Sequence, residues 1–384
     1  MSNPTGRDAI TELIRDYYRS APVPAPAEIE KREFGFGNFD DKVAFRHTSF
    51  KTEQEFKRYL VDNAPVFVDC STAYYTYPAA RPMEKKEWLG SDLGFDIDAT
   101  DIPTACKKVH GMGWLCDQCL EAAKAETLKL AESFLRDDFG ISEREMEINF
   151  SGNRGYHIHV KKKSLLRLDA GARAEISGYI RGTGLTARTL FPSMGERGMP
   201  LLGPRPNGKG WYGKVAKGFL AALDSEQSLL ELGLEPPLAR KFHDKKALVE
   251  MGMTNGNWDM IRVPKKDEVI SSVAEKLIAR LNARIDENVT KDPSHLMRLP
   301  DTIHGGTGLV ARKLGSISAL EKFDPMSGAI AFRSGEMRVK ADTKFAITMN
   351  GQQYGPFANE TVTLPAYVAT YLYLKGVANM QNGS

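Results

Sequence analysis

The hexapeptide Leu93–Asp98 constrains this fold more than any other stretch, because its alternating residues differ sharply in chemistry. As a β-strand it would place three apolar side chains on one face, and a glycine with Asp96 and Asp98 on the other. Two carboxylates side by side repel each other unless a cation lies between them. A hard divalent ion such as Mg²⁺ or Mn²⁺ is the usual partner of such oxygen ligands. An exposed strand end or turn would carry the same pair, so the rest of the chain must decide.

The overall composition is that of an ordinary soluble globular protein. The 384 residues include 52 basic and 49 acidic side chains, which gives a formal charge of +3. This balance excludes a strongly basic nucleic-acid-binding protein, so any electropositive surface must be local. The length allows one large domain or two interleaved domains. No apolar run reaches membrane-spanning length and Met1-Ser2-Asn3-Pro4 lacks a signal-peptide pattern, so we expect a cytosolic or nuclear protein.

Three of the four cysteines fall within fourteen residues, together with a histidine. The pattern is Cys106-x3-His110-x5-Cys116-x2-Cys119. In a reducing compartment such clustering indicates metal binding rather than disulfides. Zinc prefers four sulfur and nitrogen ligands in a tetrahedron, and a Cys-x2-Cys turn supplies two of them. Four protein ligands leave no open coordination position, so the sequence predicts a structural zinc site.

Residues 146–160 form the second stretch whose side chains indicate a functional site. Two alternating segments flank the five-residue turn Ser151–Gly155, which is typical of a β-hairpin. The turn offers a hydroxyl, glycine N–H groups and Arg154, which suit a phosphate group. On the second strand His157 and His159 share the face opposite the core. A plain surface loop is the alternative interpretation of the turn.

The middle of the chain, from about 165 to 280, carries less chemistry and more helical periodicity. Helices are predicted over Lys217–Leu232 and Val269–Leu281. The stretch Phe191–Gly213, which precedes both of these segments, is rich in Gly and Pro and carries positive charge. It is either a loop near a nucleic-acid strand or a surface connector. The chain ends with strand-like segments and a helix entered at Pro365.

Two further segments indicate a function only in combination with the motifs described above. Asp286 opens a plausible strand or turn, and Arg298 and His304 can reach one site from two directions. Near the start, Arg32–Phe36 reads as a short strand that mixes aromatic and charged residues, with Arg46 following.

In combination, these motifs resemble the catalytic small subunit of the archaeal and eukaryotic replicative DNA primase, with archaeal members most similar. The resemblance runs in matching order and spacing from about residue 30 to 310. The residues that carry it are Arg32-Glu33-Phe34-Gly35-Phe36 with Arg46, Asp96-Ile97-Asp98, the Cys106–Cys119 cluster, Ser151 to His157, Asp286, and His295 to Pro300 with His304.

The resemblance implies a role for each of these residues. The metal-binding catalytic residues would be Asp96, Asp98 and Asp286, holding Mg²⁺ or Mn²⁺. The nucleotide-binding residues would be Ser151, Arg154, His157, Arg298 and His304, while Glu33 and Arg46 match positions associated with the nucleotide or initiation site. The structural Zn²⁺ would be held by Cys106, His110, Cys116 and Cys119.

The resemblance also implies a fold, an activity and partners. The fold would be α+β (mixed α/β): an RNA-recognition-motif-like (RRM-like) core over 1–165 and 281–384, a mostly helical insert over 166–280, and a zinc knuckle over 104–121. The activity would be template-directed synthesis of short RNA primers, with DNA primers as a further product, by two-metal-ion nucleotidyl transfer on single-stranded DNA. The partners would be the iron–sulfur-containing large subunit in a heterodimer, the template and NTPs or dNTPs, without a membrane. Such a subunit works in the nucleoid-associated cytoplasm of an archaeon or in a eukaryotic nucleus.

Two departures and two alternatives accompany this interpretation. Asn153 stands where eukaryotic relatives often have a second arginine, and Gly306 where some relatives have a lysine; both predict weaker phosphate contacts with an intact metal site. One alternative is a repair or plasmid-type primase-polymerase, against which the position of the zinc knuckle and the absence of fused ligase, nuclease or helicase motifs argue. The other is a non-catalytic zinc-containing protein that binds single-stranded nucleic acid, which would need no third aspartate.

Overall fold

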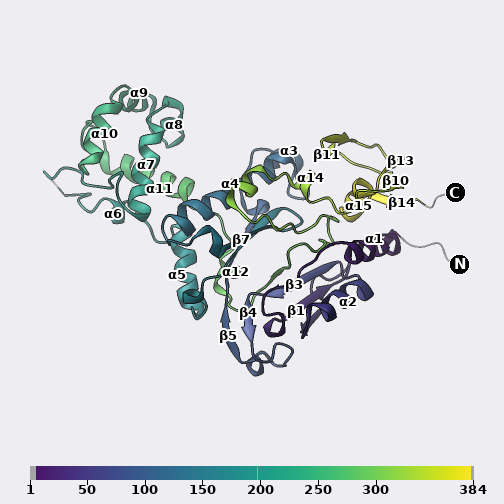
Figure 1. Ribbon diagram of the computed structural model, residues 1–384. Helices are drawn as coiled ribbons and strands as arrows, with labels where there is room; N and C mark the ends of the chain where they lie inside the picture. The colour runs from purple at the N-terminus through teal and green to yellow at the C-terminus, as the bar shows by residue number, and fades with distance from the viewer. Residues whose placement is uncertain (1–5, 197, 382–384) are drawn as a thin grey trace. The chain divides into compact units, whose positions relative to one another are not determined.

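The computed structural model describes residues 6–196 and 198–381 and confirms the predicted mixed α/β class (Figure 1). Residues 1–5, 197 and 382–384, which the predicted domains include, lie outside this part. The helices are α1 (Gly6–Ser20), α2 (Glu53–Asn63), α3 (Lys107–His110), α4 (Asp117–Lys129), α5 (Ala170–Arg181), α6 (Ala187–Leu190), α7 (Gly210–Ala222), α8 (Glu226–Glu231), α9 (Pro236–Asp244), α10 (Lys246–Thr254), α11 (Lys266–Leu281), α12 (Glu287–Lys291), α13 (Ile317–Lys322), α14 (Pro325–Gly328) and α15 (Ala366–Leu374).

The strands are short and lie in several small sheets. They are β1 (Phe34–Gly37), β2 (Phe45–Thr48), β3 (Phe67–Ser71), β4 (Ala73–Tyr75), β5 (Trp88–Ser91), β6 (Leu93–Asp98), β7 (Met146–Phe150), β8 (Gly155–Val160), β9 (Leu296–Arg298), β10 (Glu336–Ala341), β11 (Ile347–Met349), β12 (Gln352–Tyr354), β13 (Glu360–Pro365) and β14 (Ala378–Met380).

The chain divides into two compact units. The first comprises Met1–Glu132, Ile141–Ala174 and Arg284–Ser384, and contains all β-sheets of the described residues. The second comprises Ser133–Gly140 and Glu175–Ala283, and its described secondary structure is helical. Two chain segments that flank the helical region thus build one unit together, as an insertion requires. The segment Ser133–Gly140 joins the helical unit although it precedes the hairpin in sequence.

A four-stranded antiparallel sheet with the order β2-β1-β3-β9 holds the N-terminal core. Helix α2 begins after Thr52, whose hydroxyl accepts a hydrogen bond from the N–H of Glu55 as an N-cap. Its buried Phe56 packs with Phe34 and Phe50, with ring centroids about 5 Å apart. Burial of such rings is the main favourable contribution to stability here.

The second sheet, with the order β6-β8-β7, carries the aspartate-bearing strand in its outer position. The predicted alternation is confirmed, because Leu93, Phe95 and Ile97 are fully buried while Asp96 and Asp98 keep partial exposure. The predicted hairpin is also confirmed, as β7 and β8 pair antiparallel around the turn that follows Phe150.

Helices in the second unit pack around buried aromatic residues. Helix α11 contacts α7 and α6, and α8 contacts α9. Phe219 of α7 packs against Phe242 and Trp258 at centroid distances of 5.5 and 5.1 Å. This cluster gives the helical unit a core of its own.

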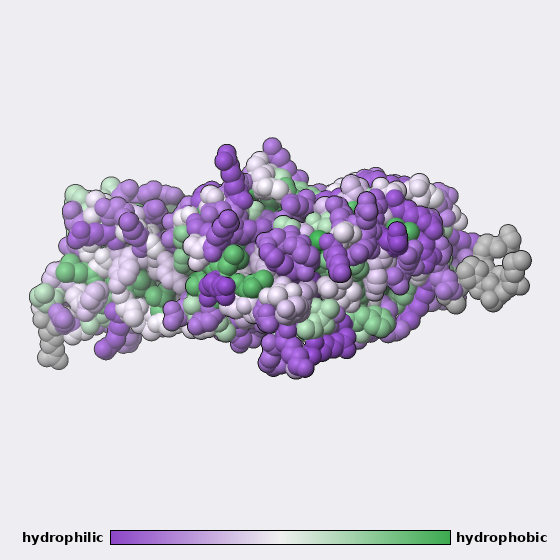
Figure 2. Space-filling view, turned by 60° about the horizontal axis from the view of Figure 1, so that its bottom comes forward, coloured by the Kyte–Doolittle hydropathy of each residue, from purple (hydrophilic) through white to green (hydrophobic). Residues whose placement is uncertain are grey.

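The surface is mostly polar. Figure 2 shows one face on which hydrophilic residues dominate and hydrophobic residues form small, separated patches. Among the described helices, none combines the length and the apolar character that crossing a membrane requires.

Candidate active site

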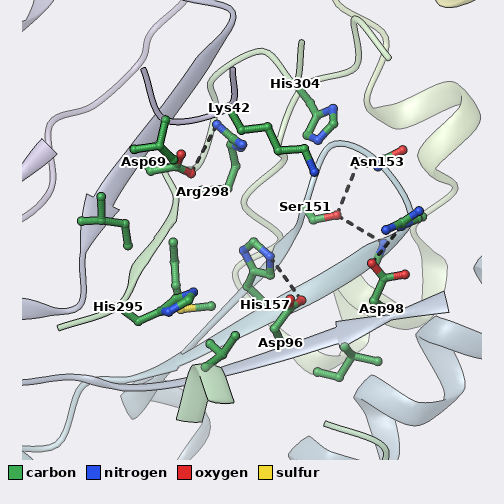
Figure 3. Close-up of a pocket in the computed structure, with 17 residues that line it drawn as sticks. Lys42, Asp69, Asp96, Asp98, Ser151, Asn153, His157, His295, Arg298 and His304 are labelled. Carbon is green, nitrogen blue, oxygen red and sulfur yellow. Dashed lines mark hydrogen bonds and ion pairs between the residues drawn. The ribbon is translucent and has the colours of Figure 1, made fainter. Parts of the chain in front are cut away.

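A polar pocket of about 280 Å³ lies in the first unit, where the second sheet, strand β9 and the loop before β2 meet (Figure 3). Its charged and polar lining consists of Lys42, Asp69, Asp96, Asp98, Ser151, Asn153, Arg154, His157, His295, Arg298 and His304. These residues come from segments up to 262 positions apart in sequence. A ligand for such a lining must carry several charges or hydrogen-bonding groups of its own.

The register between β6 and β8 fixes the two aspartates. Asp96 lies opposite His157, and Asp98 lies opposite Gly155. Oδ1 of Asp96 is 3.4 Å from Nε2 of His157, and Oδ2 of Asp98 accepts a hydrogen bond of 2.8 Å from Nε of Arg154. Burial, with the charges of Asp98 and Asp286 adding to it, raises the pKa of Asp96 to about 7. The charged form of Asp96 is therefore disfavoured, and a divalent cation bound beside the carboxylate would stabilise it.

Asp286 approaches the pair from the start of α12 rather than from a strand. Its backbone N–H donates to the carbonyl oxygen of Asp96 at 2.9 Å. Its side chain accepts from the N–H of Asn288 at 2.8 Å and so caps the helix. Of the strand or turn predicted at Asp286, the structure has no strand, because the residue caps the start of α12. Asp286 therefore lies beside Asp96 without being one of the residues that line the pocket.

The turn between β7 and β8 is folded around the hydroxyl of Ser151. Its Oγ accepts from the N–H of Gly155 at 3.2 Å, and the Ser151 N–H donates to the Gly155 carbonyl at 2.9 Å. Gly152 has a φ of +82°, and a Cβ there would lie 2.7 Å from Cβ of His304. The glycine therefore permits both the turn and the close approach of the segment that carries His304.

Two of the three pocket histidines, His157 and His304, are neutral. Burial lowers the pKa of His157 to about 3 and that of His304 well below its ordinary value. Nδ1 of His304 accepts from the N–H of Gly306 at 3.2 Å, so the ring proton lies on Nε2. Nδ1 of His157 is buried and has no hydrogen-bond partner among the described residues.

A buried ion pair and a lysine complete the opposite wall. Arg298 on β9 lies opposite Asp69 on β3, with Nη1 and Oδ1 3.3 Å apart. Burial raises the pKa of Asp69 despite this guanidinium. Lys42 extends across the pocket between this pair and Ser151, as Figure 3 shows. Its ammonium has no hydrogen-bond or ion-pair partner within the described part of the chain, so it is available to an anion.

Glu33 and Arg46, expected near the nucleotide, lie together but not among the residues lining this pocket. Nε of Arg46 donates to Oε1 of Glu33 at 3.1 Å, and the Nδ1 of His47 lies 3.2 Å from the same oxygen. Lys86 places its ammonium 3.5 Å from Oε2. The side chains of Glu33 and Lys86 are fully buried. The carboxylate is thus the centre of a cationic cluster beside β2.

Glu33→Gln is expected to destabilise the fold by about 3 kcal/mol, because it leaves the ammonium of Lys86 buried without its counter-charge. Thermal and urea unfolding of the purified variant would measure this loss. Glu84→Gln, in the same region but exposed, serves as the control and should change stability by less than about 0.5 kcal/mol. Equal stability of both variants would contradict the central role of this carboxylate.

The cysteine cluster is assembled as predicted. Ligand atoms of Cys106, His110, Cys116 and Cys119 all lie within 4.8 Å of one another, so the cluster can bind zinc. Nδ1 of His110 lies 2.7 Å from the carbonyl oxygen of Gly111, which leaves Nε2 for the metal.

Lys107 connects this cluster to the strand of the aspartates. It lies between Cys106 and His110, and its ammonium donates to the carbonyl oxygens of Ala99, Thr100 and Ile102, at 3.0 Å for Thr100. Ala99 and Thr100 belong to the 3₁₀ turn that directly follows Asp98, and Ile102 is its C-cap. The cysteine loop is therefore tied to the backbone next to the pocket.

Comparison with known proteins identifies the family. A family model described as DNA primase small subunit matches residues 95–316. The chain is 36% identical to the DNA primase small subunit PriS of Methanococcoides burtonii over 95% of this chain and 96% of that protein. It is 35% identical to PriS of Methanothrix thermoacetophila (96% and 97% covered) and 32% identical to PriS of Archaeoglobus fulgidus (96% and 97% covered). The chain belongs to the DNA primase small-subunit family.

Membership supports the resemblance inferred from the motifs and its archaeal character. It indicates a primase subunit, a nucleotidyltransferase that acts in DNA replication. A small subunit also implies a partner subunit.

For this primase subunit, the structure brings together in one pocket most of the residues predicted for the site. Those that line it are Asp96, Asp98, Ser151, Arg154, His157, Arg298 and His304. The sequence patterns gave no role to the lining residues Lys42, Asp69 and His295, whereas Asn153 is a position predicted to affect phosphate contacts. Lys42 and Asp69 belong to no motif, although an acidic residue on the apolar segment Phe67–Ser71 was a signal worth following.

Proposed function

We propose that this chain is the catalytic subunit of an archaeal DNA primase, which synthesises short RNA or DNA primers on single-stranded DNA by two-metal-ion nucleotidyl transfer. The observation that carries the proposal is the β6–β8 register, which sets Asp96 opposite His157 and Asp98 beside the cationic turn that carries Arg154. An enzyme that joins nucleotides needs this juxtaposition of anions for metal and cations for phosphate.

The carboxylates fit a catalytic metal site for Mg²⁺ or Mn²⁺. Asp96 and Asp98 would hold the ions, with Asp286 joining from α12. Burial, with the neighbouring charges of Asp98 and Asp286, raises the pKa of Asp96 to about 7, and divalent cations would offset this concentration of negative charge. When bound, the metals would lower the pKa of the attacking hydroxyl and stabilise the charge on the leaving pyrophosphate.

The chain's own donors would bind the nucleotide triphosphate. Arg154 and Arg298 supply guanidinium groups, and the turn at Ser151 supplies a hydroxyl and N–H groups. His304 presents Nε2–H as a neutral donor toward the pocket. Nε and Nη1 of Arg298 are buried and make no hydrogen bond among the described residues, although Nη1 forms the ion pair with Asp69. An incoming phosphate or sugar oxygen would supply the missing acceptor.

The other parts of the proposal concern architecture and partners. Zinc at the Cys106–Cys119 cluster would be structural. Residues 1–165 and 281–384 would form the RRM-like catalytic core, interrupted by the helical insert 166–280, in keeping with the two-unit division. The partners would be the iron–sulfur large subunit, the single-stranded template and NTPs or dNTPs. The complex would work in the cytoplasm, associated with the nucleoid of an archaeal cell.

Primer-free nucleotide incorporation on single-stranded DNA tests the proposal. Wild type and the Asp96→Asn/Asp98→Asn variant would be compared in Mg²⁺ and in Mn²⁺, alone and with the large subunit. We expect template-dependent products from the wild type and none from the variant. Products that persist in the variant, or single-strand binding without any synthesis, would move the assignment to a binding protein.

A further inference from the structure

Lys375, at the C-terminal end of α15, contacts the turn between β7 and β8 at Asn153, although the two residues are 222 positions apart in sequence. Its Nζ donates to Oδ1 of Asn153 at 3.1 Å. The ammonium also lies 5.4 Å from the ring centroid of Tyr371, on its own helix. The helix end and the turn are thus joined at the pocket rim, where Figure 3 places Asn153 beside Ser151.

This contact fixes the orientation of an amide. Oδ1 of Asn153 accepts the hydrogen bond from Lys375. The Nδ2–H₂ group of the same amide has no hydrogen-bond partner among the described residues. An amide N–H₂ donates only, and phosphate oxygens only accept. Asn153 is one of the residues that line the pocket, so its orientation decides whether the pocket gains a donor or an acceptor.

The surrounding charges point to a polyanionic ligand. Burial lowers the pKa of His304, and the nearby cations Arg298, Lys375, Lys42 and Arg154 lower it further. Arg298 and Arg154 are paired with Asp69 and Asp98, but Lys375 has only a neutral partner. A group with several negative charges would relieve the mutual repulsion of these cations.

We propose that Lys375 is a positioning residue of the nucleotide pocket: it holds Asn153 with its amide N–H₂ directed to the triphosphate and adds positive charge behind it. This inference rests on the proposed function, because it specifies how the same pocket recognises the phosphate tail.

The ammonium itself is poorly solvated. Burial, together with the neighbouring Arg154 charge, lowers the pKa of Lys375 to about 8. The titratable and charged neighbours of Lys375 are Arg154 from the turn between β7 and β8, His304 from the loop after β9, and Tyr371 from α15. Since the charged form is lost as pH rises through about 8, triphosphate affinity of the free enzyme should fall over this range. Bound triphosphate should shift the loss to higher pH.

Equilibrium binding of a non-reactive α,β-methylene nucleoside triphosphate, with Mg²⁺ present, tests the proposal on the full chain. Lys375→Met should raise Kd for the triphosphate about tenfold and Kd for the corresponding monophosphate less than twofold. It should also flatten the decline in affinity between pH 7 and 9.5. Lys375→Arg, which stays charged, should restore affinity and bind well at the upper end of that range. Lys340→Met, at an exposed position on β10, is the matched control.

A double-mutant cycle separates positioning from a general charge effect. If Lys375 acts in part through Asn153, the loss of triphosphate affinity in the Asn153→Ala/Lys375→Met double variant should be smaller than the sum of the two separate losses. Fully additive losses, or a Lys375→Met variant that binds triphosphate like wild type at unchanged thermal stability, would overturn the proposal. Arg154→Met distinguishes failure of this inference from failure of the proposed function. If Arg154→Met weakens triphosphate binding while Lys375→Met does not, only the inference about Lys375 fails. If neither weakens binding, the proposed nucleotide pocket fails as well.

Discussion

Replacing Asp98 by asparagine is expected to reduce nucleotide addition about a thousandfold while the fold stays intact. Asparagine retains the oxygen that accepts from the N–H of Thr100 at 2.8 Å, so the 3₁₀ turn after the strand remains capped. It loses the charge that would bind a divalent metal, and loss of several kcal/mol of transition-state stabilisation corresponds to about a thousandfold in rate. Primer-free incorporation at saturating nucleotide measures this as a loss of kcat.

The control for Asp98→Asn is Asp101→Asn. Asp101 lies in the same 3₁₀ turn but is exposed and does not line the pocket. This variant should keep near-normal activity, and both variants should keep wild-type zinc content and unfolding temperature. If Asp98→Asn retained a tenth or more of the wild-type kcat, its carboxylate would not be a metal ligand.

Local patterns predicted the parts of the site that lie on one strand or one hairpin. Asp96 and Asp98 were recognisable because strand alternation separates them from an apolar face that must be buried. The turn at Ser151 was recognisable because two glycines and alternating flanks are typical of a hairpin. In both cases the information lies within about fifteen residues, and the structure confirms the elements.

Tertiary packing supplied what these patterns could not. Lys42 and Lys375 come from a loop and a helix end without a motif, and only the fold brings them to the turn at Asn153. Conversely, Glu33 and Arg46 matched a motif yet lie outside the pocket lining, because Glu33, directly before β1, is buried between Arg46 of β2 and Lys86. A sequence match identifies a residue worth studying, but the direction of its side chain depends on how the sheets pack.

Cys119→Ala is expected to abolish zinc binding and to unfold the loop from Cys106 to Cys119. Sγ of Cys119 lies 3.5 Å from Sγ of Cys106 and 3.6 Å from Nε2 of His110, so it is central to the ligand set. A structural zinc site contributes folding free energy on the order of several kcal/mol. Zinc content, thermal unfolding and proteolysis within the loop would measure the loss. Cys70→Ala, at a buried cysteine outside the cluster, should retain zinc.

The same loop should influence catalysis through Lys107. Lys107→Met removes the ammonium that binds three carbonyl oxygens beside Asp98, so kcat should fall about tenfold while zinc stays bound. Lys108→Met, at the exposed neighbouring position, should leave kcat unchanged. A zinc-free Cys119→Ala protein should lose at least as much activity as Lys107→Met. When its cysteine loop unfolds, the hydrogen bonds from Lys107 to the carbonyl oxygens beside Asp98 are lost together with the other contacts of the loop. If Lys107→Met behaved like Lys108→Met, the loop would support folding without positioning the catalytic strand.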